Sequence, residues 1–192
     1  PEQWDEAQST MAKILDDLGV NYEIGIDEAA YYGPKLDIQI RNVFGKEDTL
    51  ITIQIDQLLA EKFGMEYVDV DGTKRNPYII HRTSLGCYER SLALIIEKFA
   101  GALPLWMSPE QVRILPIADR HHEAAKELER KLSAVGIRVT CDTRNEKIGY
   151  KIREARLQKV PYMLVAGDSE IENGTVSVRQ RGGVDLGSMT LE

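Results

Sequence analysis

The segment HRTSLGCYER, residues 81–90, places two arginines, a histidine and a glutamate around a Ser-Leu-Gly turn. The apolar run SLALIIEKFAG, residues 91–101, follows it directly. Together they predict a buried core helix over residues 85–100. Because unpaired charges are costly to bury, the charged groups at the mouth of such a helix need an explanation. They are either solvated by position or arranged to hold a charged ligand.

The segments upstream of this motif alternate in the manner of an antiparallel sheet. LDIQI (36–40) and LITIQID (50–56) place isoleucine or leucine at every second position and polar residues between them. The short connection between the two predicts an antiparallel pair with one apolar and one polar face. PYIIHR (77–82) is a third predicted strand, which brings His81 next to this pair.

The polar face of the predicted sheet is a candidate binding surface. It carries Thr52, Gln54 and Asp56, and YYGPK (31–35) adds two phenols and a lysine at the entrance of the first strand. With His81 beside them, these groups suit a small polar ligand together with a phosphate-bearing one. Sheets also turn such faces simply to water, and a lone histidine in a strand is usually structural. The residues alone therefore leave ligand binding and a solvated face open.

GALPLWMSPEQ, residues 101–111, contains two prolines and a glycine and predicts a linker. After it, short apolar strands alternate with amphipathic helices, the order expected of an α/β sheet with parallel neighbours. The strands are predicted over 112–117, 137–142, 161–167 and 175–181, and the helices over 121–136 and 146–160.

The fold class predicted for the chain is therefore α+β followed by α/β, in two units joined near residue 104. Residues 1–103 form an antiparallel sheet with helices, including a helix over 2–18, and 20–26 is a further strand candidate. Residues 104–192 form a mostly parallel sheet flanked by helices. Near the end of the chain, Ser188 has the residue type of an N-cap and predicts the start of another helix.

The composition is that of a water-soluble protein: 43% of the 192 residues are hydrophobic and 29% are charged. No apolar run is long enough to span a membrane, and the acidic N-terminus has no signal core. We therefore expect a cytoplasmic protein without a membrane partner, in which Cys87 and Cys141 are reduced thiols. The absence of an initiator Met suggests part of a longer protein.

The net charge of −7 is distributed unevenly along the chain. Residues 1–103 hold 10 Lys/Arg and 18 Asp/Glu, whereas residues 104–192 hold 14 and 13. Basic residues cluster from Arg144 to Lys159, which indicates either a polyanion site or a solvated helix face. His121 and His122, at the start of an amphipathic helix, are interpreted as solvated residues.

Several of these motifs, in this order, resemble the class II aminoacyl-tRNA synthetase core. They are YYGPK, TIQID, HRTSLGCYER and EKFAG, and HRTSLGCYER is similar to the third signature motif of that class, which ends in Glu-Arg. The histidine that opens it and the stretch from Arg144 to Glu172 resemble the threonyl-tRNA synthetase family in particular. The resemblance covers nearly the whole chain.

This resemblance implies a fold and a reaction. Residues 1–103 would be the later part of the catalytic domain, and residues 104–192 an anticodon-binding domain without its last helix. The family activates threonine with ATP and Mg²⁺, esterifies it to its tRNA, and uses a zinc ion to recognise the substrate hydroxyl. The full-length protein would be a homodimer.

The resemblance also implies roles for individual residues. Arg90 and Lys35 correspond to catalytic positions, with Arg90 packed on the adenine of ATP. Tyr32, Thr52 and Gln54 surround the threonine and the adenylate, and His81 is one of three zinc ligands. The anticodon contacts implied are Asn145, Lys147, Arg153, Glu170 and Arg179.

The chain also departs from the family pattern. The first two signature motifs, the other two zinc ligands and an editing domain have no counterpart in these 192 residues. The chain alone is therefore expected to be inactive, and a non-catalytic tRNA- or RNA-binding module derived from a synthetase is the alternative function. A synthetase for another amino acid of the subclass, such as proline or glycine, is a third hypothesis, against which His81 argues.

Overall fold

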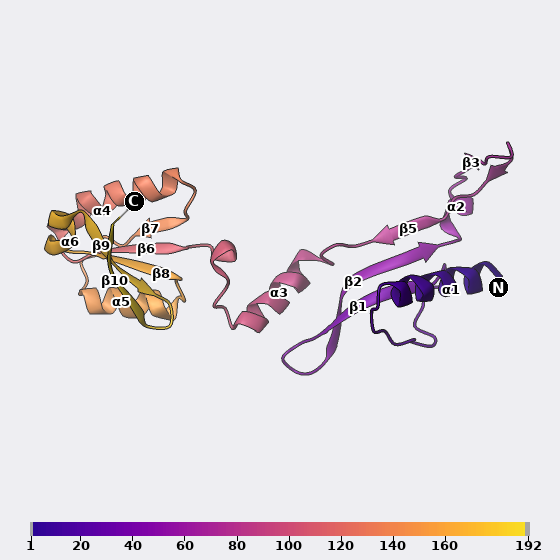
Figure 1. The fold of residues 1–192 in the computed structure, drawn as a ribbon, viewed down its shortest axis with the longest axis horizontal. Helices are drawn as coiled ribbons and strands as arrows, with labels where there is room; N and C mark the ends of the chain where they lie inside the picture. The colour runs from indigo at the N-terminus through magenta and orange to yellow at the C-terminus, as the bar shows by residue number, and fades with distance from the viewer. Residues whose placement is uncertain (1, 191–192) are drawn as a thin grey trace. The chain divides into compact units, whose positions relative to one another are not determined.

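The computed structural model describes residues 2–190 and divides into two compact units, Pro1–Leu94 and Ile95–Glu192 (Figure 1). The division falls within helix α3 (Tyr88–Phe99). The proposed domain boundary between residues 103 and 104 lies after this helix and stays a prediction. Each unit is described by itself below.

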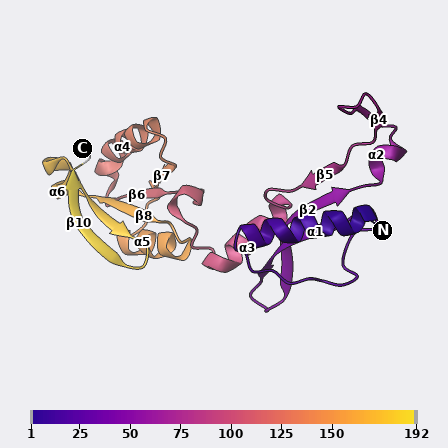
Figure 2. The same ribbon diagram turned by 45° about the vertical axis from the view of Figure 1, so that its right-hand side comes forward.

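The first unit is built on a three-stranded antiparallel sheet. Its strands are β1 (Lys35–Arg41), β2 (Glu47–Asp56) and β5 (Ile79–Arg82), in the order β1-β2-β5. The three strands predicted from alternation are thus confirmed. Helix α1 (Glu2–Asp17) is also as predicted and lies beside the sheet (Figures 1 and 2), where Gln57 Nε2 donates to the Gln3 carbonyl at 2.9 Å.

Three short elements of the first unit were not predicted. They are α2 (Leu59–Lys62) and a hairpin of β3 (Tyr67–Val68) and β4 (Lys74–Arg75). In contrast, the strand predicted over residues 20–26 is wrong, because this exposed segment has no strand geometry. Apolar alternation alone does not make a strand, which also needs a partner to complete its hydrogen bonds.

Helix α3 forms where the sequence predicts a helix, but the expectation that it is buried is wrong. None of its residues is buried, and Leu92 and Ile96 remain 50% and 45% exposed. Its apolar side has no extensive packing partner among the described helices and strands. The turn that precedes the helix depends on Gly86, which has a φ of +65° and packs so closely on the Leu50 carbonyl that a Cβ would clash.

The second unit contains a five-stranded mixed sheet in the order β10-β9-β8-β6-β7. Strands β6 (Val112–Pro116), β7 (Val139–Cys141) and β8 (Tyr162–Ala166) are parallel, and β9 (Thr175–Gln180) and β10 (Val184–Thr190) are antiparallel. The helices are α4 (His122–Ala134), α5 (Ile148–Leu157) and α6 (Asp168–Asn173). The predicted α/β unit is therefore confirmed, except that α6 and β10 were not expected.

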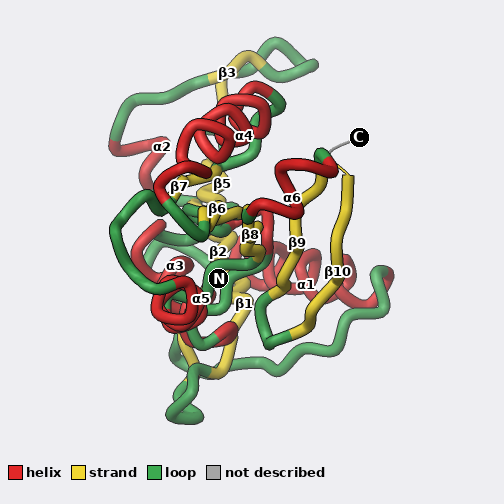
Figure 3. Tube along the Cα trace, turned by 90° about the vertical axis from the view of Figure 1, so that its left-hand side faces the viewer, coloured by secondary structure: helices red, strands yellow, loops and turns green. Residues whose placement is uncertain are grey.

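The helix predicted to start at Ser188 is wrong, because this residue lies inside β10 and pairs with Ser177 of β9. Gly182 and Gly183, with φ values of +92° and +90°, reverse the chain and bring the two strands together. Figure 3 shows β9 and β10 running side by side at the edge of the sheet.

Helices α4 and α5 cover opposite faces of this sheet (Figures 1 and 3). Ala125 and Leu128 of α4 belong to one buried cluster, together with Ile114 of β6. Ala155 of α5 belongs to the other, together with Leu115 and Met163. No helix within residues 2–190 combines the length and the apolarity needed to cross a membrane.

The segment predicted as a linker is fastened to the second unit. It includes a short 3₁₀ turn, Leu105–Met107. Arg138 donates to the carbonyls of Ser108 and Trp106 at 2.9 and 2.8 Å, and Arg181 donates to the carbonyl of Leu103 at 3.0 Å. These bonds fix the backbone before β6 without any regular secondary structure.

Candidate functional site

The polar face of the first sheet brings five predicted site residues together. Lys35, Gln54 and His81 are cross-strand neighbours on β1, β2 and β5, because Lys35 pairs with Gln54 and Gln54 pairs with His81. Thr52, which pairs with Asp37, lies on the same face of β2. Tyr32 joins this group from the segment before β1. The backbone carbonyl of Tyr32 accepts from the Gln57 N–H at 3.0 Å.

Direct hydrogen bonds link the side chains of this face. Tyr32 Oη donates to Gln54 Oε1 at 2.6 Å, and the Tyr32 ring centroid lies 5.8 Å from that of His81. On the other side, Thr52 Oγ1 donates to Asp37 Oδ1 at 2.7 Å, and Lys35 Nζ lies 2.7 Å from Asp37 Oδ2. Asp37 therefore orders two predicted site residues, although the sequence interpretation did not single it out.

His81 is held by Asp56, the buried carboxylate at the end of β2. His81 Nε2 lies 2.9 Å from Asp56 Oδ2, while Asp56 Oδ1 accepts from the N–H groups of Leu58 and Leu59 at 2.9 Å each. Burial alone would raise the pKa of Asp56, but these backbone donors and His81 lower it below its ordinary value. The anionic carboxylate of Asp56 thereby fixes the His81 ring through Nε2.

A zinc site needs more donors than this arrangement offers. Carboxylate-bound imidazoles are typical of zinc ligands, so the His81–Asp56 pair has the right chemistry for one ligand. A catalytic zinc, however, takes three protein ligands. Across the part of the chain that the structure describes, no three His, Cys, Asp or Glu side chains are grouped to hold a metal ion. The residues present therefore do not by themselves fit a zinc ion.

Arg90 lies apart from the cross-strand neighbours Lys35, Gln54 and His81. It is an exposed residue of α3, and its Nη1 donates to the carbonyl of Thr49 at 2.9 Å. Thr49 lies near the start of β2, roughly 16 Å along the strand from Gln54 at the usual rise per residue. The structure thus joins Arg90 to the backbone of β2, and no described hydrogen bond or ion pair links it to the other predicted residues.

In the second unit, three predicted residues come from the segments that follow parallel strands at one edge of the sheet. Asn145 and Lys147 follow β7, and Glu170 follows β8, so all three lie beyond the carboxyl ends of parallel strands. Ligands of open α/β sheets bind at this edge, where successive connections leave toward opposite faces. A hollow of about 230 Å³ lies here, lined by residues that include Ile117, Ala118 and Asn145.

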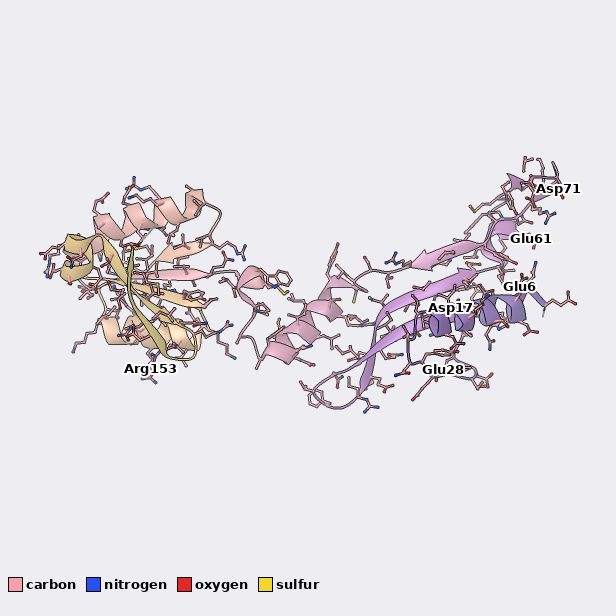
Figure 4. The ribbon with its side chains drawn as sticks, viewed as in Figure 1. Glu6, Asp17, Glu28, Glu61, Asp71 and Arg153 are labelled. Atoms are coloured by element: carbon pink, nitrogen blue, oxygen red, sulfur yellow. The ribbon has the colours of Figure 1, made fainter. Side chains whose placement is uncertain are left out.

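The basic run from Arg144 to Lys159 is only partly a solvent-facing surface. Lys151 is buried, and its Nζ donates to the carbonyls of Pro116 and Asp142 at 3.1 and 2.9 Å. Arg144 binds the carboxylates of Asp142 and Glu154, and this guanidinium holds the pKa of Asp142 below its ordinary value. The interpretation of the whole run as one basic face is therefore corrected. Arg153, by contrast, points away from the sheet on the outer side of α5 (Figure 4).

The structure does not bring Arg179 to the loops that carry Glu170. Arg179 pairs with Met163 near the amino end of β8, whereas Glu170 follows the carboxyl end of that strand. Its Nη2 lies 3.6 Å from Asp185 Oδ2, and its buried Nε has no hydrogen-bond partner among the described residues. Arg179 thus lies away from the sheet edge beyond which Asn145, Lys147 and Glu170 are placed.

His121 is not the solvated residue that the sequence interpretation expected. Its side chain is 3% exposed, its Nδ1 accepts from the Ala118 N–H at 3.2 Å, and its Nε2 lies 2.8 Å from Asp168 Oδ1. Arg120 binds the same carboxylate, and the hydrogen bonds from Arg120 and His121 hold the pKa of Asp168 well below its usual range. No periodic pattern could find this contact, because it joins loops far apart in the sequence.

Comparison with known proteins divides the chain in a similar way. Residues 1–99 match the family model described as "tRNA synthetase class II core domain (G, H, P, S and T)". Residues 111–192 match the model described as "Anticodon binding domain". The chain thus combines these two kinds of domain, in that order.

Curated relatives are threonine–tRNA ligases. The chain is 56% identical over 192 residues to the Clostridium botulinum (strain Eklund 17B / Type B) protein and covers 30% of its length. It is 46% identical over 185 residues to the Staphylococcus aureus (strain JH9) protein and covers 29% of it. The chain therefore spans about 30% of the length of these relatives.

A solved structure supports the same assignment. The crystal structure of the RNA binding domain of threonyl-tRNA synthetase from Cryptosporidium parvum Iowa II superposes with a TM-score of 0.89 at 37% identity. The match covers 99% of this chain and 48% of that one. The chain therefore belongs to the threonyl-tRNA synthetase family, and it comprises the later part of a class II core followed by an anticodon-binding domain.

Proposed function

We propose that the chain is part of an enzyme that activates threonine with ATP and transfers it to threonine tRNA, and that its second unit reads the anticodon. The observation that carries this proposal is the position of Asn145, Lys147 and Glu170 around one edge of the sheet in a domain of the anticodon-binding family. Because the chain spans about 30% of its relatives, the reaction belongs to the longer protein.

In the first unit, the polar face of the three-stranded sheet would face threonine and the adenylate. Activation joins the threonine carboxylate to the α-phosphorus of ATP, supplied as its Mg²⁺ complex, and releases pyrophosphate. A hydroxyl of the terminal tRNA ribose then attacks the carbonyl carbon, and AMP leaves. Tyr32, Thr52 and Gln54 supply hydroxyl and amide groups for the polar parts of the substrate, and Lys35 supplies a cation close by.

The proposed role of Arg90 needs a bound nucleotide, and the proposed role of His81 needs two further zinc ligands. An arginine suits adenine stacking and phosphate contact, and Arg90 is exposed enough to exchange its bond to Thr49 for such a ligand. His81 would be one of three zinc ligands, which requires two ligands that residues 2–190 do not group with it. The longer protein is proposed to be a cytoplasmic homodimer.

In the second unit, reading of the anticodon would divide among residues by chemistry. Lys147 and Arg153 are exposed cations that can bind phosphate, which positions RNA without reading its sequence. Asn145 can both donate to and accept from a base edge. An ionised Glu170 only accepts, so it selects a base that presents N–H groups. Arg179 could stack on or fork to a splayed base.

Binding of the 192-residue chain to synthetic anticodon stem–loops tests this reading. The threonine arm should bind more tightly than arms that differ only in one anticodon base. Glu170→Ala should reduce this preference by about 1–3 kcal/mol, the worth of one base contact. Equal affinity of the folded, unsubstituted chain for all arms would contradict selective reading.

Threonine-dependent exchange of pyrophosphate into ATP separates the chain from the complete enzyme. We expect no exchange by the isolated chain above a heat-inactivated control, because positioning supplies much of such catalysis and Arg90 alone cannot position the α-phosphate. The alternative function, a non-catalytic RNA-binding module, shares this result. The two differ in the longer natural protein, where exchange supports the synthetase and its absence supports the binding module.

A further inference from the structure

Three residues from two separate segments of the chain form a cluster around the Asp168 carboxylate, which we call the Asp168 clamp. It consists of Arg120 and His121, which lie between β6 and α4, and Asp168, the first residue of α6. Because His121 Nδ1 accepts from the Ala118 N–H, its Nε2 carries a proton and donates to Asp168 Oδ1 at 2.8 Å. Arg120 Nε donates to the same oxygen at 2.8 Å, and Arg120 Nη2 donates to Oδ2.

The clamp fixes the helix that carries Glu170. Within α6, Glu170 Oε2 accepts from the Gly167 N–H at 3.0 Å, directly before Asp168. Gly167 is packed so closely that an added Cβ would lie 2.6 Å from Ile117 Cδ1. The Ile117 N–H in turn donates to the Ala166 carbonyl at 3.0 Å. Backbone, side-chain packing and clamp therefore all tie the loop after β8 to the loop after β6.

We propose that His121, Arg120 and Asp168 are positioning residues that hold the Glu170 carboxylate in place for the anticodon base it reads. This inference rests on the proposed function. A carboxylate discriminates between base edges only if its oxygens lie in line with the N–H groups it accepts from, so displacement of α6 costs selectivity. The described bonds of Glu170 occupy Oε2, which leaves Oε1 for a base.

Burial distinguishes this cluster from an ordinary surface ion pair. The Arg120 and Asp168 side chains are 67% and 59% exposed, and such pairs alone contribute little to stability. His121 is different, since it is 3% exposed, its Nδ1 binds the backbone of its own segment at Ala118, and its Nε2 binds Asp168 of the other. A buried polar side chain whose hydrogen bonds are all satisfied restricts the positions of the groups that it binds.

The test measures the preference of the 192-residue chain for the threonine anticodon stem–loop over the same RNA with one anticodon base changed. Asp168→Ala should lower this preference about tenfold, or about 1.4 kcal/mol. Glu123→Ala is the matched control, because it also removes one carboxylate and this 92% exposed side chain of α4 lies outside the clamp. The control should keep the preference of the unsubstituted chain.

A double-mutant cycle shows whether Asp168 acts through Glu170. If it does, the Asp168→Ala/Glu170→Ala variant should discriminate no worse than Glu170→Ala alone. Additive losses would mean that Asp168 affects the RNA by another route, which overturns the inference. Asp168→Asn should recover most of the preference, because its amide oxygen still accepts from His121 Nε2.

Folding of each variant is checked by its thermal transition. If Asp168→Ala does not fold, Arg120→Gln replaces it, since this exposed position can change without opening the core. Loss of preference in Arg120→Gln supports the clamp, and an unchanged preference contradicts it. The proposed function has its own outcome: an unsubstituted chain that does not discriminate refutes anticodon reading, whereas a selective chain with a selective Asp168→Ala variant refutes only the clamp.

Discussion

At the residue scale, Asp56 joins the end of β2 to α2 and to His81, although no role in ligand binding is proposed for it. One of its oxygens accepts from two backbone N–H groups at the start of α2, and the other holds His81. Alternation along β2 placed Asp56 on the polar face correctly. It could not predict that Asp56 is fully buried, because depth depends on how α2 and His81 close over the strand end.

Asp56→Ala should lower the free energy of unfolding at pH 7 by about 1–3 kcal/mol, since it leaves buried donors without an acceptor. The folded-state pKa of Asp56 lies below its ordinary value of 3.8. The stabilisation is therefore fully present above the unfolded-state pKa and is lost as the pH falls through the folded-state pKa. Urea unfolding at pH 7, 5 and 3 should show a constant gap between the two proteins at pH 7 and 5. The gap should narrow at pH 3, and a gap that widens on acidification would contradict this account.

At the element scale, the buried Lys151 and the exposed Arg153 of α5 have different tasks. Lys151→Met should lower the free energy of unfolding by about 1–3 kcal/mol, because the carbonyls of Pro116 and Asp142 lose their donor. Arg153→Ala should leave stability within about 0.5 kcal/mol. It should weaken all RNAs alike and reduce the slope of log affinity against log salt by about 1. Unfolding curves and salt titrations of both variants separate the two roles. An unchanged salt slope in Arg153→Ala would mean that Arg153 does not contact RNA phosphate.

Helices of at least two turns and strands with a clear apolar pattern could be predicted from the sequence, and shorter helices could not. Helices α4 and α5 follow their apolar spacing, and the parallel strands follow their apolar runs. Helix α6 is only six residues long, too short for a period to be recognised. Strand β10 was missed because it exists through pairing with β9, and an isolated serine resembles an N-cap in either case. The same limit explains why the gathering of Asn145 and Glu170 at one sheet edge required the fold.

At the scale of the whole molecule, buried apolar side chains are concentrated in the second unit. Both described apolar clusters belong to it, whereas the buried apolar side chains described in the first unit are the small ones of Ala7, Pro34 and Ala60. Hydrogen exchange should therefore be slowest in β6 and β8, and faster in α3, whose residues are all at least partly exposed. Exchange followed by mass spectrometry on the native chain tests this. Equal protection of α3 and β6 would mean that the first unit is more stable than its burial indicates.

The bonds from Arg138 and Arg181 to the backbone of residues 103–108 bear on how the second unit can be produced by recombinant expression. The match to the anticodon-binding family begins at residue 111, which makes that position a natural choice for a shortened gene. A product starting there lacks the Leu103, Trp106 and Ser108 carbonyls that these guanidinium groups bind. Lys159 would also lose the Ala100 carbonyl. A gene that starts before Ala100 keeps all four acceptors, so the piece suited to isolation is longer at its amino end than the family match.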